Sequence, residues 1–234
     1  MALVEVSAFR KVMRKRIVLD DVSCLFSAGR VYAIRGQNGS GKTMLLRAIA
    51  GLILPTSGFV TVDGLQVGKD VEFPQDMGLL IEEPAFIGTL TGFRNLELLA
   101  SIRGRIGGEE IRESLMRCGL DPDDRRRFSQ YSLGMKQRLG IACAIMEKPG
   151  LLLLDEPFNA LDASGIAQTC EILDQERARG VTIIVATHDK YELELVQDCV
   201  LTMDKGRLIG YEEVMRGRPS GAPGEWEAID TCSV

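Results

Sequence analysis

The chain has 234 residues, of which 45% are hydrophobic and 26% are charged, and its formal net charge is −5 at pH 7. This length and composition allow one large domain, or two small ones, with a sizeable buried core. The acidic balance excludes the overall positive charge by which proteins hold nucleic-acid phosphates, so no nucleic-acid partner is expected, despite basic runs at residues 10–16 and 125–127.

The first 34 residues are rich in β-forming residues. Residues 3–8 and 17–26 both alternate between apolar and polar side chains, and the basic segment 10–16 joins them. This pattern predicts a hairpin. Residues 31–34 then form a short apolar run that predicts a buried strand.

A glycine-rich stretch follows this strand and carries the strongest motif in the chain. It matches the phosphate-binding loop pattern at every fixed position and consists of Gly36, Gln37, Asn38, Gly39, Ser40, Gly41, Lys42 and Thr43. In such a loop the backbone N–H groups and the start of the next helix bind phosphates. The lysine adds a positive charge near the β and γ oxygens, and the threonine hydroxyl can ligate Mg²⁺. The alternative is a simple strand-to-helix turn, but an apolar helical stripe follows the loop and supports a nucleoside triphosphate site.

The rest of the chain alternates between strand and helix patterns. Strands are expected at residues 59–62, 77–81, 151–154 and 181–186, and a final hairpin is expected over residues 199–210. Between residues 91 and 147 the apolar residues recur with helical spacing, and a further helix is expected over residues 164–179. A single phosphate loop predicts one nucleotide domain, residues 2–213, with a helical subdomain at about 88–147. The glycine- and proline-rich residues 214–234 predict a loose tail.

Two acids follow the apolar strand 151–154. In an open parallel sheet this is the edge where ligands bind, so Asp155 is a candidate to hold Mg²⁺ through a water, and Glu156 is a candidate base for an attacking water. Two acids after a strand are more often a helix cap, but the upstream phosphate loop favours the catalytic interpretation. His188 ends the next strand and can reach the same edge, where it would bind the γ-phosphate or the water, although a lone strand-end histidine is usually structural.

A third polar stretch precedes the apolar helix that begins near Leu139. Ser132 can be a simple helix N-cap, or it can form an anion site together with the backbone near Gly134 and the positive end of the helix. At the tip of a separate helical subdomain this site could not fold back onto its own phosphate loop.

The cysteines and the hydrophobic runs bear on location. Six cysteines are scattered without a C-x-x-C pair or a signal pattern before them, which is typical of reduced thiols in a cytoplasmic protein. No apolar run approaches the roughly 18 residues that a membrane-spanning helix needs, so any membrane role is expected to come through a partner.

Taken together, these motifs resemble the ATP-binding subunit of an ABC transporter over residues 2 to about 213. The phosphate loop corresponds to Walker A, residues 151–156 to Walker B with its catalytic glutamate, residues 159–162 to the D-loop, and His188 to the switch histidine. The usual signature Leu-Ser-Gly-Gly-Gln is Tyr-Ser-Leu-Gly-Met at residues 131–135. Glu82 occupies the position of the Q-loop glutamine. These two departures make the chain similar to the bacterial subgroup that exports bacitracin-like and lantibiotic peptides.

The resemblance implies an α/β fold: a P-loop NTPase core with a parallel sheet, an N-terminal antiparallel β subdomain and an inserted helical subdomain. It implies ATP hydrolysis that depends on Mg²⁺, with Thr43 and Asp155 at the metal. We expect Glu82 on the metal side too, directly or through water, because its charge would otherwise repel the γ-phosphate. It also implies a head-to-tail pair of ATP subunits, in which Ser132 and Gly134 of one close over Lys42 of the other, with Asp162 at the same site.

The implied partner is a separate membrane permease, which would hold this chain at the inner face of the cell membrane. A soluble ABC ATPase that drives an assembly process is the alternative. An ATP-gated scaffold without turnover is a third possibility, disfavoured by the intact pair of acids after strand 151–154. For the aromatic side chain that stacks on adenine, Phe9 is the nearest candidate.

Overall fold

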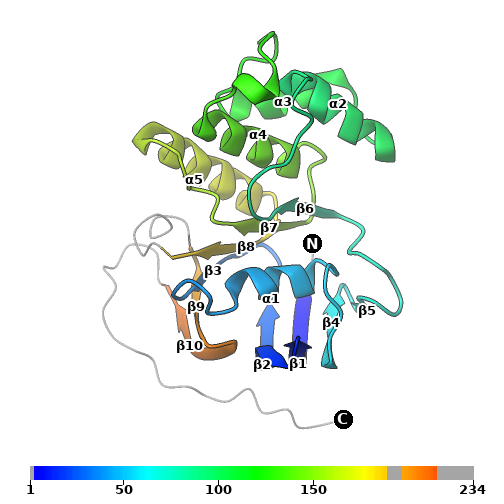
Figure 1. Ribbon diagram of the computed structural model, residues 1–234, viewed down its shortest axis with the longest axis vertical. Helices are drawn as coiled ribbons and strands as arrows, with labels where there is room; N and C mark the ends of the chain where they lie inside the picture. Colours follow the sequence, from blue (N-terminus) through cyan, green and yellow to red (C-terminus); the bar gives the residue numbers. More distant parts are fainter. Residues whose placement is uncertain (1–2, 189–196, 215–234) are drawn as a thin grey trace.

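The computed structural model describes residues 3–188 and 197–214, which form two β-sheets and a set of helices (Figure 1). The predicted tail lies outside the described residues, apart from Val214. In chain order the elements are β1 (Val4–Met13), β2 (Arg16–Phe26), β3 (Val31–Arg35), α1 (Lys42–Ile49), β4 (Ser57–Val62), β5 (Leu65–Gln66), β6 (Met77–Leu80), α2 (Gly92–Arg103), α3 (Gly108–Arg117), the 3-10 helix η1 (Phe128–Gln130), α4 (Leu133–Ile145), β7 (Leu151–Asp155), α5 (Ala163–Ala178), β8 (Thr182–Thr187), β9 (Cys199–Asp204) and β10 (Arg207–Glu213).

The larger sheet has the strand order β10-β9-β3-β8-β7-β6, and all its neighbouring pairs are parallel except β9 with β10. Strands β7 and β8 are buried at every position. Apart from Asp155 and the threonines at the two ends of β8, their residues are apolar, because both faces of the sheet are covered. The smaller sheet, β2-β1-β4-β5, is antiparallel. The predicted parallel strands and both hairpins are confirmed.

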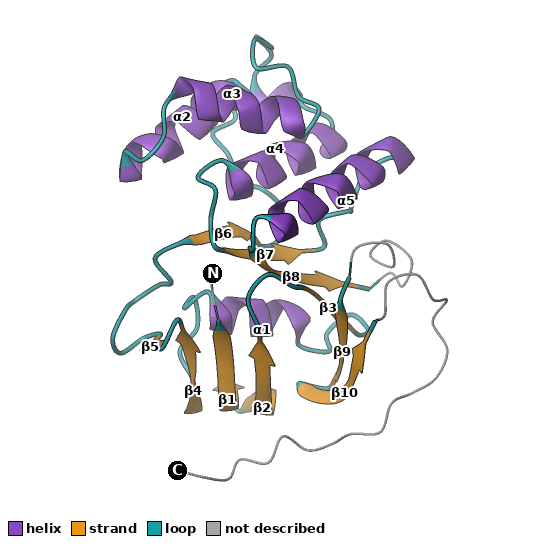
Figure 2. Cartoon of the chain, turned by 180° about the vertical axis from the view of Figure 1, so that it is seen from behind, coloured by secondary structure: helices purple, strands orange, loops and turns teal. Residues whose placement is uncertain are grey.

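The larger sheet separates two hydrophobic cores. Successive side chains of a strand point to opposite faces, so Leu152 and Leu154 pack in one core while Leu151 and Leu153 pack in the other. The second core also contains α1 and the inner face of the antiparallel sheet. Figures 1 and 2 show α1 between the two sheets and the helices α2–α5 beyond the opposite face of the larger sheet. This is the predicted fold class, with α2, α3, η1 and α4 inserted between β6 and β7.

The N-terminal hairpin differs from its prediction in one respect. The basic segment is strand rather than connection, because β1 continues to Met13 and only Arg14 and Lys15 form the turn. Both have positive φ values, 48° and 64°, as a tight two-residue hairpin turn requires. The alternation of β1 is also broken by irregular register between Val6 and Phe9. Phe9 is therefore only 1% exposed, and the proposal that it stacks on adenine is wrong.

Gly78 marks the closest approach of β6 to α4. A Cβ at this position would lie 2.0 Å from the carbonyl oxygen of Ala144 and 2.8 Å from Cδ1 of Leu152. Since backbone cannot yield as a flexible side chain does, Gly78→Ala should lower the free energy of unfolding by about 1–3 kcal/mol in urea denaturation. Gly88→Ala is the matched control, because its Cβ would meet only Ser129 at 3.7 Å. Equal stability of the two variants would contradict this packing.

Candidate functional site

The phosphate loop connects β3 to α1, as predicted. Glycine is required at its start, because a Cβ at Gly36 would lie 2.4 Å from the carbonyl oxygen of Met203. Gly41 caps α1 with a left-handed φ of 109°. A hollow of about 440 Å³ opens over the loop. Its described lining consists of Arg16, Ile17, Val18, residues 38–44, Glu156, Lys205 and Gly206.

Lys42 is held inside this loop. Its ammonium group donates to the carbonyl oxygens of Gly36 at 2.8 Å and of Gln37 at 3.4 Å, and it lies 3.9 Å from Oε1 of Glu156. The side chain is only 6% exposed. A largely buried ammonium that faces the hollow has the charge and the location to bind an anion there.

Thr43 and Asp155 join the loop helix to β7. The Thr43 hydroxyl donates to Oδ2 of Asp155 at 2.8 Å, while Oδ1 of Asp155 is buried and has no hydrogen-bond partner. Burial raises the pKa of Asp155 and the Thr43 hydrogen bond opposes that rise, while the charges of Glu156 and Glu82 add to it. An orphaned buried carboxylate oxygen beside a hydroxyl fits Mg²⁺, which is bound by few protein oxygens and keeps several waters. Thr43 and Asp155 could therefore hold this metal.

Glu156 lies directly after β7 in a left-handed conformation, with φ 48°. Its backbone is fixed on both sides, because its N–H donates to Ala186 and its carbonyl oxygen accepts from Nε2 of Gln137 at 3.0 Å. Its carboxylate lies between Lys42 and His188, with Oε2 2.8 Å from Nδ1 of the histidine. The structure thus brings together the predicted base, the predicted switch histidine and the loop lysine.

Ser132 caps α4, and its hydroxyl accepts from the N–H of Met135 at 3.2 Å. Neither Ser132 nor Gly134 is among the described residues that line the hollow over the phosphate loop. The two stretches are therefore not brought together within one chain. This arrangement agrees with the sequence argument that the serine site points away from its own loop.

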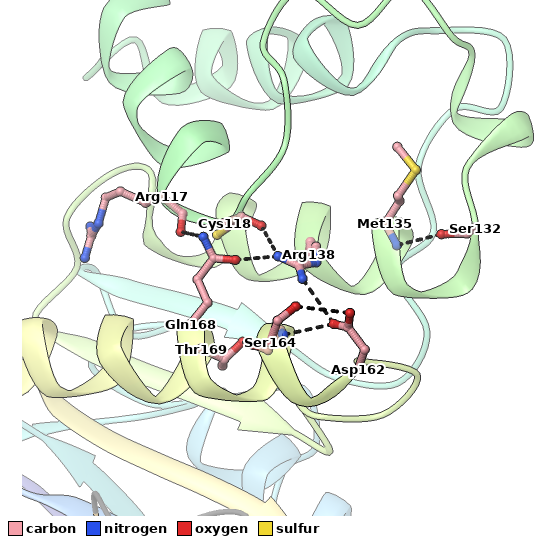
Figure 3. A network of polar contacts seen from close by, with 10 residues as sticks. Arg117, Cys118, Ser132, Met135, Arg138, Asp162, Ser164, Gln168 and Thr169 are labelled. Atoms are coloured by element: carbon pink, nitrogen blue, oxygen red, sulfur yellow. Dashed lines mark hydrogen bonds and ion pairs between the residues drawn. The ribbon is translucent and has the colours of Figure 1, made fainter.

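Asp162 caps α5 in a polar network that links three helices (Figure 3). It accepts from the N–H of Gly165, from Ser164 and from Arg138. These contacts, the Gly165 hydrogen bond above all, lower the pKa of its carboxyl group. Arg138 of α4 also donates to the carbonyl oxygen of Cys118, at the end of α3, and to Gln168 of α5. The network therefore fixes α4, the helix capped by Ser132, relative to α5, the helix capped by Asp162.

Unlike Thr43 and Asp155, the other predicted metal-side residues, Glu82 forms an ion pair with a basic side chain. Its carboxylate pairs with Arg47 of α1, with Nη2 and Oε1 2.5 Å apart. It shares a second cavity, of about 360 Å³, with Asp155 and Glu156.

The sequence patterns did not predict the roles of Arg47 and Gln137. The first could have been found from its position four residues after Thr43, one helical turn along the same face. Gln137 bonds to the backbone carbonyl oxygen of Glu156, so no spacing in the sequence indicates the contact.

A family model described as ABC transporter matches residues 19–159. The chain belongs to the ABC transporter family. It is 44% identical over 218 residues to an uncharacterized ABC transporter ATP-binding protein, YybJ of Bacillus subtilis (strain 168), which covers 93% of this chain and all of that protein.

Two further relatives carry functional names. The chain is 36% identical to the bacitracin transport ATP-binding protein BcrA of Enterococcus faecalis, over 91% of this chain and 69% of that protein. It is 34% identical to the lantibiotic transport ATP-binding protein SrtF of Streptococcus pyogenes, over 88% of this chain and 89% of that protein. These names fit the ATP-binding subunit of an ABC transporter and not the alternative of an assembly ATPase.

The solved structures agree. One titled as the ATP-binding subunit of an ABC transporter superposes with a TM-score of 0.82 at 28% identity, and it covers 91% of this chain and 90% of that one. A dimeric post-hydrolysis cassette bound to ADP and Pi, MJ0796, shares the fold with a TM-score of 0.81 at 23% identity, over 90% of this chain and 98% of that one. By its family and the names of its relatives, this ABC protein is an ATP-binding, ATP-hydrolysing subunit. Within residues 3–188 and 197–214, no helix is long and apolar enough to cross a bilayer.

Replacing Lys42 tests the phosphate loop. Lys42→Ala should weaken ATP binding by at least about 10-fold in calorimetry, because a largely buried charge that faces the phosphates is lost. Lys205→Ala is the control, since this exposed lysine lines the same hollow and should change the affinity by no more than about threefold. Equally small effects of the two substitutions on ATP affinity would show that Lys42 does not bind the phosphates.

Proposed function

We propose that this ATP-binding subunit powers a separate membrane permease that exports peptide or drug-like substrates. The observation that carries the proposal is the convergence of Lys42, Thr43, Asp155, Glu156 and His188 at one edge of the parallel sheet. The names of the bacitracin and lantibiotic transport relatives support the substrate class. The residues of the phosphate loop, Gly36 to Thr43, bind the triphosphate.

In the proposed mechanism, Lys42 neutralises charge on the β and γ phosphates. Thr43 and Asp155 would hold Mg²⁺, with Glu82 on the same side, and the bound metal would supply further neutralisation of the phosphates. Glu156 accepts a proton from the attacking water. His188 touches the carboxylate of Glu156 and is placed to orient the water or to donate to the γ-phosphate.

The site is completed by a second ATP subunit in a head-to-tail dimer. Ser132 and Gly134 of that subunit bind the γ-phosphate, and Asp162 lies at the same junction. Two observations support this part of the proposal. Ser132 and Gly134 are not among the described residues that line the hollow over the phosphate loop of the same chain, and a cassette of the same fold is dimeric.

Glu156→Gln tests the chemistry. The amide keeps the size of the side chain but cannot accept the proton, so hydrolysis should fall at least about 100-fold while ATP binding persists. Glu83→Gln, in the neighbouring cavity, should leave turnover within about twofold. Near-normal turnover in purified Glu156→Gln would contradict the role of Glu156 as base.

For the permease, we propose a contact surface on α2. Ile102 is 76% exposed, the largest value among the exposed large apolar side chains, and Leu98 and Leu99 are also exposed. A groove of about 210 Å³ lies beside them, between α2, α4 and the edge strand β6. Because β6 leads directly to Glu82, a partner seated here would contact the element that ends at the nucleotide site.

Ile102→Asp tests this surface. The tagged wild-type chain should co-purify, after mild solubilisation of its native membrane, with a protein that has several spanning helices. The Ile102→Asp chain should lose at least about 90% of that partner and keep its own ATPase activity. Met116→Asp is the control, since Met116 is exposed on α3 of the same helical region. Capture of no membrane-spanning protein by the wild-type chain would contradict the permease itself.

A further inference from the structure

The ion pair between Arg47 and Glu82 connects α1 to the end of β6. Arg47 follows Thr43 by four residues, so both side chains lie on the same face of α1, and Thr43 holds Asp155. Glu82 lies two residues after the end of β6 and has a φ of 60°, a conformation that non-glycine residues seldom adopt. The pair therefore lies one helical turn away from the Thr43–Asp155 hydrogen bond.

The cavity beside this pair is strongly acidic. Glu82, Glu83, Asp155 and Glu156 all line it, and Lys136 is the single basic residue of its described lining. A triphosphate in the neighbouring hollow adds several negative charges. An uncompensated Glu82 would repel them.

We propose that Arg47 is a positioning residue for nucleotide binding: it holds the Glu82 carboxylate against α1 and neutralises it, so that the triphosphate can enter an otherwise acidic site. This inference rests on the proposed ATP site and adds a residue to it. Lys42, another cation near these acids, faces Glu156 and the loop carbonyls and does not reach Glu82 by any contact in the described chain.

The exposure of the pair separates this role from a structural one. The side chain of Glu82 is 64% exposed and that of Arg47 is 31% exposed. Ion pairs this accessible contribute little to the free energy of unfolding. Removal of Arg47 should therefore change ATP affinity and leave the melting temperature nearly unchanged.

The test measures ATP binding to the full chain by calorimetry in EDTA, so that no metal contributes. Arg47→Gln should bind ATP about 3- to 10-fold more weakly than the wild type, and the loss should shrink in high salt as the repulsion is screened. Glu82→Gln in the Arg47→Gln background should restore the affinity to within about twofold of wild type. Arg47→Lys, which keeps the charge, should also stay within about twofold.

The control is a second Arg–Glu pair, Arg103 at the end of α2 with Glu147 just after α4, whose groups lie 2.9 Å apart. Arg103→Gln should leave ATP affinity unchanged. Unchanged affinity in Arg47→Gln, or a loss that Glu82→Gln does not restore, would overturn the inference.

These outcomes can be told apart from a failure of the proposed function. If Lys42→Ala also binds ATP normally, the nucleotide site itself is wrong. If Lys42→Ala loses ATP and Arg47→Gln does not, the counter-ion role alone fails.

Discussion

The candidate site depends on one constraint: parallel strands covered on both faces end at the same edge of their sheet. Strands β3, β7 and β8 lie side by side, so the phosphate loop, the two acids after β7 and the histidine after β8 meet at that edge although they are far apart in the chain. The two hydrophobic cores fix the sheet from both sides. The Thr43–Asp155 hydrogen bond then fixes α1 to β7 across the site. Packing energy thus sets the geometry that the polar groups use.

Much of this arrangement follows from local sequence patterns. Buried parallel strands are short apolar runs, and the phosphate loop has fixed residue spacing, so their positions and their common edge could be predicted. The motifs also predicted that Glu156 and His188 reach the same edge of the sheet, since each follows one of two neighbouring strands, and the structure adds the contact between them.

What could not be predicted arises from irregular backbone and from contacts between distant segments. Regular alternation along β1 would place Phe9 on the outer face, but the register shift between Val6 and Phe9 turns its side chain into the core. Gln137 supports Glu156 through a carbonyl oxygen, a group that every residue possesses, so its sequence position gives no sign of the contact. Arg47 finds its partner only because β6 and α1 converge in space. Such partners require coordinates.

The place of β3 in the sheet also affects how the protein is made. β3, which carries the phosphate loop, pairs with β8 and β9 and with no other described strand. Those partners leave the ribosome about 150 residues later, which at ordinary rates of synthesis is roughly 8 to 30 s. Until then the apolar strand β3 lacks both of its neighbours in the sheet, and the phosphate loop lacks the strands that lie beside it. The loop therefore cannot take up its folded surroundings, and offer the nucleotide its complete site, before β8 and β9 have been made.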